Sequence, residues 1–169
     1  VEKVDEFRYL GSKVRSNGEC VREVKKRVQA GWSGWRRVAG VVCDRRVFAR
    51  VKGKINRTVV RPAMLYGLET MALSKRQEVE LKVAELKMLG FSLGVMRIDR
   101  IRNEFIRGTA HVGSFRDKVK QDQLRWFGHV QRRDMGYIGR KMLRMEPPGR
   151  RKRGRPRRSF MDVLREDMQ

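Results

Sequence analysis

From residue 21 onward, apolar side chains recur every three or four positions, which is the spacing of amphipathic helices. The first stripe consists of Val21, Val24, Val28, Trp32, Trp35, Ala39 and Val42. The second consists of Phe48, Val51, Ile55 and Val59, and Pro62 after it predicts a kink or a restart of the chain. A third, made of Val79, Val83 and Leu86, follows the capping pattern Ser74-x-x-Gln77. The middle of the chain is therefore expected to be helical.

Polar residues at the start of later apolar runs predict where further helices begin. Asp99 is expected to cap a short helix that holds Ile101 and Phe105 and ends at Gly108. Ser114 is expected to cap a helix whose inward face is Phe115, Val119, Trp126, Phe127 and Val130. Ser159 is expected to cap the last helix, with an apolar patch of Phe160, Val163 and Leu164.

The first 18 residues have a different pattern. "EFRYLGSKVRSNG" contains short runs of aromatic and branched residues, broken by Gly11 and ended by the turn pair Asn17-Gly18. Two short strands fit this segment. The expected fold class is therefore mainly α, with a short N-terminal β-hairpin.

The net charge of the chain adds an expectation about function to this helical fold, because it favours binding to a polyanion. The 169 residues include 42 Lys plus Arg and 19 Asp plus Glu, a formal net charge of +23. Such an excess favours nucleic acid as the partner. The polar face of the first helical segment carries Arg22, Lys25, Lys26, Arg36 and Arg37. Such a face is commonly solvated surface, but here almost no acid balances it, which favours contact with phosphate at least as much.

Several other classes of protein are not supported. No apolar run approaches the ~20 residues that cross a bilayer, and the first residues lack the features of a signal peptide, so an intracellular protein with no membrane partner is expected. Cys20, Cys43, His111 and His129 lack zinc-ligand spacing. We interpret them as packing or surface residues, and expect no metal site.

Catalytic chemistry finds little support either. The chain has no Asp-Asp pair, and its Asp residues are scattered among Arg and Lys. A nuclease could be built on Glu69 and the pair Glu85-x-Lys87, but helical surfaces often produce that spacing by chance. Ser33 and Ser114 lack the context of a hydrolase nucleophile. We therefore expect no catalytic residue, no cofactor and no small-molecule substrate.

A basic cluster lies near the end of the chain, in "GRRKRGRPRRSF". Its cations are Arg150, Arg151, Lys152, Arg153, Arg155, Arg157 and Arg158. The core Arg-Gly-Arg-Pro is typical of an AT-hook, which lies in the minor groove of A·T-rich DNA. A general phosphate-binding or nuclear-import cluster is the alternative that we favour. The cluster also favours nuclear over cytoplasmic localisation.

Five segments together resemble a known family. "FRYLGSKVRSNG", "VVRPAMLYGLET", "RIDRIRNEFIRGT", "QLRWFGHVQRRD" and "GRRKRGRPRRSFMDVLREDM" are similar, in this order, to the C-terminal part of the reverse transcriptase polyprotein of non-LTR retrotransposons, most nearly the RTE type. The resemblance covers essentially all 169 residues. It departs from the family at Met71 and Phe160, where the family usually has Trp, as a decayed or repurposed copy would.

The resemblance implies an organisation of the chain. Residues 1–18 correspond to a primer-grip-like hairpin, 19–72 to a helical thumb, 73–146 to a helical C-terminal extension, 147–158 to a basic Pro/Gly/Arg linker and 159–169 to a short terminal helix. The primer-grip-like positions are Phe7, Tyr9, Leu10 and Gly11. The polymerase palm would precede this segment and act as a partner domain. Mg²⁺ is expected only for that palm, whose carboxylates this chain lacks.

Three hypotheses about function follow. The leading one is a nucleic-acid-binding fragment of an RNA-directed DNA polymerase that grips template-primer or target DNA and has no catalysis of its own. The second is an independent small nuclear protein, derived from such an element, that binds DNA or RNA. The third is a helical protein-interaction module, which would expose Trp32, Trp35, Trp126 and Phe127 when isolated.

Overall fold

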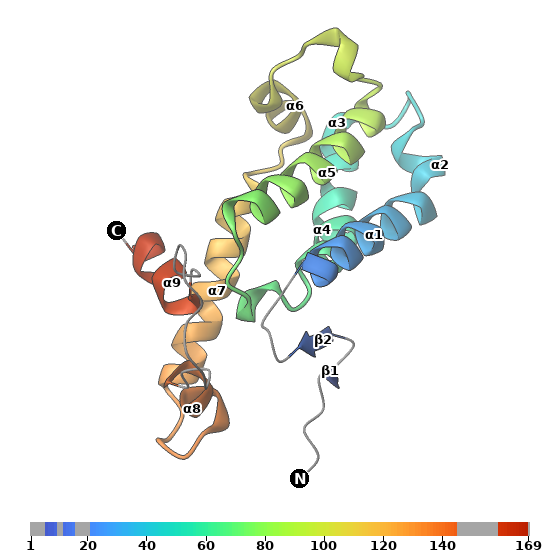
Figure 1. The fold of residues 1–169 in the computed structure, drawn as a ribbon. Coiled ribbons are helices and arrows are strands. Elements are labelled where there is room, and N and C mark those ends of the chain that lie inside the picture. Colours follow the sequence, from blue (N-terminus) through green and yellow to red (C-terminus); the bar gives the residue numbers. More distant parts are fainter. Residues whose placement is uncertain (1–5, 10–11, 16–20, 145–158, 169) are drawn as a thin grey trace.

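The structure of the protein is a computed structural model that describes residues 6–9, 12–15, 21–144 and 159–168 (Figure 1). Two short strands, β1 (Glu6–Tyr9) and β2 (Ser12–Arg15), pair antiparallel in the register Glu6↔Arg15 to Tyr9↔Ser12. The rest of the described chain is helices and their connections. The expectation of a mainly α fold is confirmed.

The helices follow one another with short connections. The first half contains α1 (Val21–Arg37), α2 (Ala39–Val42), α3 (Ala49–Ile55), the π-helical turn η1 (Asn56–Val60), α4 (Arg61–Leu65) and the 3₁₀ turn η2 (Leu68–Thr70). The second half contains α5 (Lys75–Leu93), the 3₁₀ turn η3 (Arg97–Asp99), α6 (Asn103–Ala110), α7 (Phe115–Gln131), α8 (Ile138–Arg144) and α9 (Phe160–Met168).

In the centre of the structure, α1 packs on both α4 and α5 (Figure 1). From this centre α7 runs toward α8 and α9, and α6 lies at the other end, against α3 and α5. The main core contains Val24, Val60, Met64, Leu68, Leu73, Leu81, Ala84, Met88, Phe115 and Val119. This core draws on residues from both sides of position 72, which is the expected boundary between the thumb-like and extension segments.

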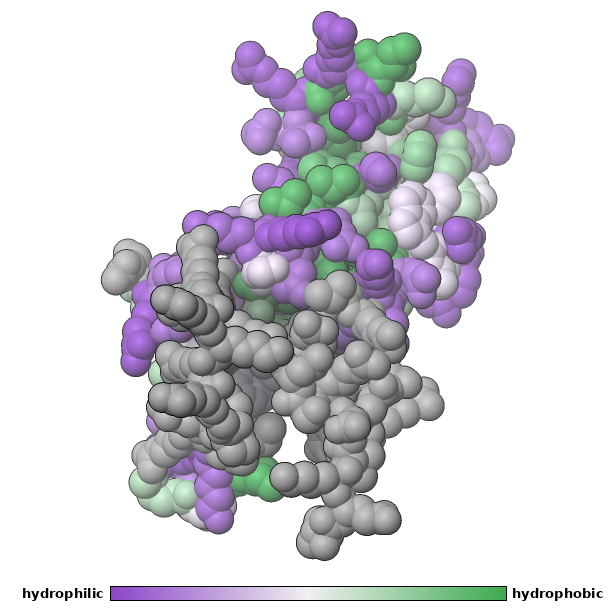
Figure 2. Space-filling model, viewed as in Figure 1, coloured by the Kyte–Doolittle hydropathy of each residue, from purple (hydrophilic) through white to green (hydrophobic). Residues whose placement is uncertain are grey.

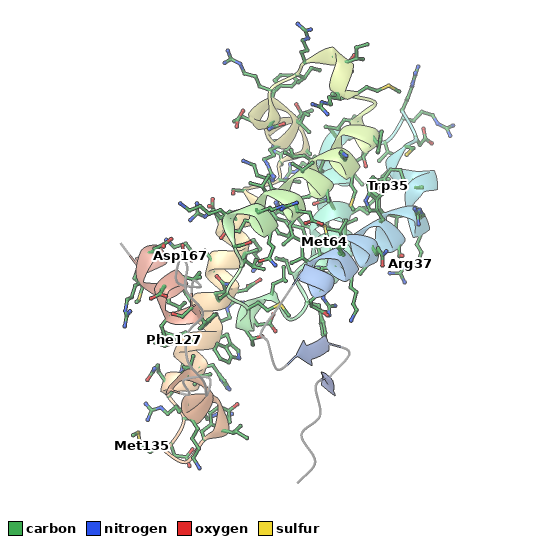
Figure 3. All side chains as sticks on the ribbon, viewed as in Figure 1. Trp35, Arg37, Met64, Phe127, Met135 and Asp167 are labelled. Atoms are coloured by element: carbon green, nitrogen blue, oxygen red, sulfur yellow. The ribbon has the colours of Figure 1, made fainter. Side chains whose placement is uncertain are left out.

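The first apolar stripe packs as expected, but in two helices. Val24 is fully buried, and Trp35 reaches α5, where its Nε1 donates hydrogen bonds to the Met88 carbonyl oxygen (3.1 Å) and to Ser92 Oγ (2.9 Å). Figure 3 shows Trp35 and Met64 within the central helices, while Arg37 lies at their outer edge. The helical run is broken at Val38, so α1 ends at Arg37 and α2 follows as a separate turn.

Only half of the second predicted stripe packs inward, since Ile55 and Val59 are half-buried whereas Phe48 and Val51 are exposed. Phe48 is 81% exposed, and the buried residues of α3 include Lys52 and Gly53 instead. Lys52 is buried because its ammonium donates a 2.7 Å hydrogen bond to the Ser92 carbonyl oxygen. Gly53 faces α6 so closely that a Cβ there would lie 1.7 Å from the carbonyl oxygen of Ala110. Because α6 approaches so closely, α3 buries the face that carries Gly53 rather than its more apolar face.

Pro62 does not restart the chain. The backbone keeps right-handed helical dihedrals at Ile55, Val60 and Arg61, and Pro62 lies in the first turn of α4. A proline is tolerated in the first turn of an α-helix, because the backbone N–H that it lacks would have no carbonyl partner within that helix. The π-helical turn η1 accommodates the change ahead of it.

In α5 the cap is confirmed, but of the predicted face Val79, Val83 and Leu86 only Leu86 is buried. Ser74 Oγ accepts from the Gln77 backbone N–H (3.3 Å), and Gln77 Oε1 accepts from the Ser74 backbone N–H (2.8 Å). Val79 is 57% exposed, while the buried face of α5 includes Leu81, Ala84, Glu85, Met88 and Leu89. The buried face contains a carboxylate, which no apolar periodicity could mark as inward.

Between residues 99 and 110, a short helix that holds Phe105 is present as predicted, but its predicted cap and bounds are wrong. α6 begins at Asn103 and runs to Ala110, and Asp99 accepts a 2.7 Å hydrogen bond from the Met96 backbone N–H instead of capping α6. Ile101 and Phe105 are exposed, together with Met96 and Ile98. In Figure 2 hydrophobic residues appear among hydrophilic ones at the end of the molecule that holds α6.

The last two predicted caps are confirmed. Ser114 Oγ accepts from the Asp117 backbone N–H (3.5 Å), and Ser159 Oγ accepts from the Asp162 backbone N–H (3.2 Å). α7 buries Phe115, Val119 and Val130. Trp126 packs edge to face on Phe160, with ring centroids 5.4 Å apart, and so connects α7 to α9. Trp32, Trp35, Trp126 and Phe127 are partly buried, so the expectation that they are exposed in isolation is wrong.

Candidate nucleic-acid interface

The outer face of α1 carries the cations that the sequence assigns to phosphate contact. Lys25, Arg36 and Arg37 are exposed, and none of the three has a hydrogen bond or ion pair with another residue in the described part of the chain. They lie on one side of the helix, since their helical angles fall within about a third of a turn at 100° per residue. Within the described residues, no acidic side chain neutralises this side of α1.

Lys26 departs from the expectation of an unbalanced basic face. Its ammonium lies 3.3 Å from one carboxylate oxygen of Glu23. The other carboxylate oxygen of Glu23 accepts a hydrogen bond from Arg27. Burial by itself raises the pKa of Glu23, but the hydrogen bonds and charges of Arg27 and then Lys26 outweigh it and hold that pKa below its ordinary value. Glu23 thus neutralises part of the positive charge of α1 from the buried side.

The other predicted site residues are only partly placed by the structure. Phe7 and Tyr9 lie in β1, where they pair with Val14 and Ser12, and Arg22 lies in the first turn of α1. Leu10, Gly11 and all seven cations of the tail, Arg150, Arg151, Lys152, Arg153, Arg155, Arg157 and Arg158, lie outside the described residues.

Two arginines turn out to be structural. The Arg61 guanidinium donates to Glu85 and to the Gly113 carbonyl oxygen, and Arg107 Nη1 lies 2.9 Å from Glu85 and 3.0 Å from the same carbonyl oxygen. Glu85 is fully buried. A nuclease that uses Glu85 is therefore not supported, because both carboxylate oxygens already bind arginine and cannot hold a metal in contact with solvent.

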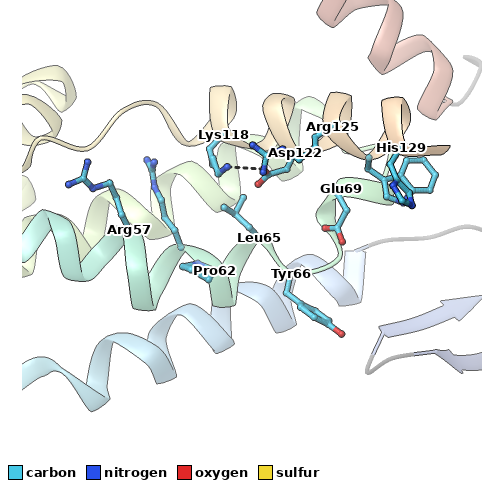
Figure 4. Close-up of a pocket in the computed structure, with 11 residues that line it drawn as sticks. Arg57, Pro62, Leu65, Tyr66, Glu69, Lys118, Asp122, Arg125 and His129 are labelled. Carbon is cyan, nitrogen blue, oxygen red and sulfur yellow. Dashed lines mark hydrogen bonds and ion pairs between the residues drawn. The ribbon is translucent and has the colours of Figure 1, made fainter. Parts of the chain in front are cut away.

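The sequence did not reveal an open cleft of about 640 Å³ between α4 and α7 (Figure 4). We call it the α4–α7 cleft. Its α4 side consists of Arg57, Arg61, Pro62, Leu65, Tyr66 and Glu69, and its α7 side of Lys118, Asp122, Arg125, Trp126 and His129. Positions 118, 122, 125 and 129 recur at helical spacing and form one face of α7. That face is roughly 16 Å long at 1.5 Å per residue.

The polar lining of the α4–α7 cleft is basic on balance. Arg57 and Arg125 are exposed, and Arg57 has no ion pair or hydrogen bond to any residue that the structure describes. Lys118 is bound to Asp122, with 2.8 Å between the ammonium and the carboxylate oxygen (Figure 4). Asp122 also lies 4.0 Å from Arg125. One carboxylate therefore offsets part of the positive charge on α7.

Tyr66 and Trp126 are among the residues that line the α4–α7 cleft. Trp126 lines it while packing on Phe160, and Tyr66 is 51% exposed with the Arg27 guanidinium 4.9 Å from its ring centroid. In the sequence, the helical spacing of polar residues from 118 to 129 beside Trp126 could have indicated this cleft. It was missed because the opposite wall comes from residues about 60 positions earlier in the chain.

The described residues do not support two other kinds of site. No group of three or more His, Cys, Asp or Glu side chains in this part of the chain could hold a metal ion. Likewise, none of its helices is both long enough and apolar enough to cross a membrane.

The chain is similar to a known protein from a nematode. A Caenorhabditis elegans protein described as uncharacterized and transposon-derived is 27% identical over 176 aligned positions, which include 99% of this chain. The chain spans 62% of the length of that relative. No protein-family model matches the chain, and no solved structure matches it. The sequence is therefore similar, over nearly its whole length, to a transposon-derived protein.

Proposed function

We propose that this chain is a nucleic-acid-binding segment of a transposon-derived protein. The observation that carries the proposal is the exposed face of α1, where Lys25, Arg36 and Arg37 have no acidic partner in the described structure. Exposed cations gathered on one helix, within a chain of net charge +23, are what contact with a phosphate backbone needs.

The finer proposal is that the segment is the thumb and C-terminal extension of a non-LTR retrotransposon reverse transcriptase. It is supported by the five sequence segments quoted above and by the similarity to a transposon-derived protein. In this proposal β1 and β2 act as the primer-grip-like hairpin, and the helices that follow lie along the template-primer duplex. The segment would have no polymerase activity by itself, because the chain has no Asp-Asp pair to bind the two metal ions.

A protein-interaction module is the second candidate function, and one observation favours it. Met96, Ile98 and Phe105 are all more than half exposed in and beside η3 and α6. Exposed apolar residues that are close together often mark a protein contact. The predicted aromatic anchors Trp35 and Trp126 do not support this function, because they pack on Phe91 and Phe160.

Fluorescence anisotropy tests nucleic-acid binding directly. The protein should bind duplex DNA and an RNA–DNA hybrid, and its affinity should fall steeply between about 50 and 200 mM salt, with a linear log–log dependence. A flat salt dependence, or no binding at the lower salt concentration, would contradict the proposal.

Primer extension tests the finer proposal. On a primed poly(A) template with Mg²⁺ or Mn²⁺, the protein should incorporate no more nucleotide than a buffer control. Incorporation above that control would show that the chain carries a catalytic centre of its own.

A further inference from the structure

We infer that the α4–α7 cleft binds a short stretch of single-stranded nucleic acid, with phosphates on Arg57 and Arg125 and an unpaired base against Trp126. This inference rests on the proposed nucleic-acid binding and specifies which form of nucleic acid the cleft takes.

The phosphate contacts follow from the cations on the two walls. Arg57 extends from η1 and Arg125 from α7, so they face the α4–α7 cleft from opposite sides (Figure 4). Each is exposed, and their planar guanidinium groups can donate two parallel hydrogen bonds to one phosphate. Arg61, which also lines the cleft, is buried, and its Nε and Nη2 already donate to Glu85 and Gly113.

The base contact follows from Trp126. Its ring is fixed by edge-to-face packing on Phe160, yet it remains partly exposed and lines the α4–α7 cleft. Pro62 and Leu65 add apolar surface on the opposite wall. A base in a duplex has both faces covered by its neighbours, whereas an unpaired base can stack on an aromatic side chain. The ring therefore favours a single strand over a duplex.

The two carboxylates of the α4–α7 cleft support the same assignment. Glu69 and Asp122 would repel a phosphate, so they would not help a groove that contacts only the phosphate backbone of a nucleic acid. They can accept hydrogen bonds from N–H groups on the Watson–Crick edges of unpaired bases, including the N3–H of thymine. Lys118, bound to Asp122 at 2.8 Å, keeps that carboxylate oriented.

Tryptophan emission reports on the base contact. The chain has three tryptophans, and Trp32 and Trp35 pack against the main core, away from the α4–α7 cleft. A titration with a short oligo(dT) should quench the emission of the unmodified protein. It should not quench Trp126→Phe, although anisotropy should show that this variant still binds the oligonucleotide. Equal quenching in both proteins would overturn the inference, and so would binding without quenching in the unmodified protein.

A charge experiment tests the phosphate contacts without disturbing the core. Arg57→Gln with Arg125→Gln should weaken binding to oligo(dT) on the order of tenfold or more and lower the log–log salt slope by about 1.4, at ~0.7 per contact. The matched control is Lys87→Gln with Arg97→Gln, which removes two exposed charges that do not line the cleft. Binding to duplex DNA should change equally in the two double variants.

The outcomes separate this inference from the proposed function. If the unmodified protein binds neither duplex nor single strand, the proposed function itself fails. If it binds duplex DNA, but the Arg57 and Arg125 variant weakens duplex and single strand by the same factor, only the assignment of the α4–α7 cleft fails.

Discussion

Arg61 of α4 donates a hydrogen bond to Glu85 of α5, and both side chains are buried. Arg107 of α6 binds the second carboxylate oxygen of Glu85, and both arginines donate to the Gly113 carbonyl oxygen ahead of α7. One carboxylate therefore holds together cations from two helices at the point where four helices meet.

Replacing Glu85 should destabilise the fold severely. Glu85→Gln keeps the shape of the side chain but leaves Arg61 and Arg107 buried without a counter-charge, and removing one partner of a buried ion pair costs about 3–5 kcal/mol. Urea unfolding should show this loss in the free energy of unfolding. Glu80→Gln, at an exposed position of the same helix, should change it by no more than about 0.5 kcal/mol. Similar midpoints for the two variants would show that the ion pairs contribute nothing net.

Two glycines should respond in opposite directions to substitution by alanine. A Cβ at Gly53 would lie 1.7 Å from the Ala110 carbonyl oxygen, so Gly53→Ala must displace α6 from α3 and lower the thermal midpoint. Gly108 lies within α6 with no atom within 4 Å of an added Cβ. Gly108→Ala should therefore stabilise the helix by about 0.5–1 kcal/mol. A tolerated Gly53→Ala would contradict the close approach of these helices.

Glu23 should make the fold sensitive to acid. Its pKa lies below the ordinary 4.5, because hydrogen bonds and charges of Arg27 and Lys26 outweigh the effect of burial. A carboxyl group whose pKa is depressed by folding contributes stability above its unfolded pKa, and this is lost as pH falls through the folded pKa. The free energy of unfolding should therefore decrease below about pH 4.5, and less steeply in Glu23→Gln. A pH profile unchanged by that substitution would exclude this role for Glu23.

The outer face of α1 should determine much of the salt dependence of duplex binding. Lys25→Gln, Arg36→Gln and Arg37→Gln together should make the log–log salt slope shallower by up to about 2.7, at ~0.9 per phosphate contact. The control removes three exposed charges elsewhere, by Arg45→Gln, Lys87→Gln and Arg97→Gln. An equal change in both triple variants would indicate that net charge acts rather than the face of α1.

The basic tail should act as a general phosphate clamp. Deleting residues 150–158 should weaken binding to all duplexes alike and make the salt slope shallower by at most roughly 6 units. Arg153→Ala with Arg155→Ala should then behave like Arg150→Ala with Arg151→Ala. A loss confined to A·T-rich duplex in the first double variant would identify a true AT-hook.

The sequence alone predicted the features that depend on neighbours in the chain. The helical class, the apolar stripe of α1 and the caps at Ser74, Ser114 and Ser159 were predicted correctly, because capping and periodicity act over three or four residues. The exposure of Lys25, Arg36 and Arg37 was also predicted, since a charged face of an amphipathic helix avoids the core.

Only the tertiary structure decided which faces of the later helices are buried. Phe48 and Val79 are exposed, whereas Lys52 and Glu85 are buried, because Ser92 and two arginines satisfy those charges. A buried charge is stable only when its partners surround it, and here the partners lie 22 to 40 positions away in the chain.

The α4–α7 cleft was likewise decided only by the tertiary structure. Arg57 and Arg125 belong to segments that no local pattern connects, and they line the same cleft because α4 and α7 both pack around the main core. Hydrophobic burial fixes the positions of these helices, and the cleft with its cations and aromatic rings is a consequence of that packing.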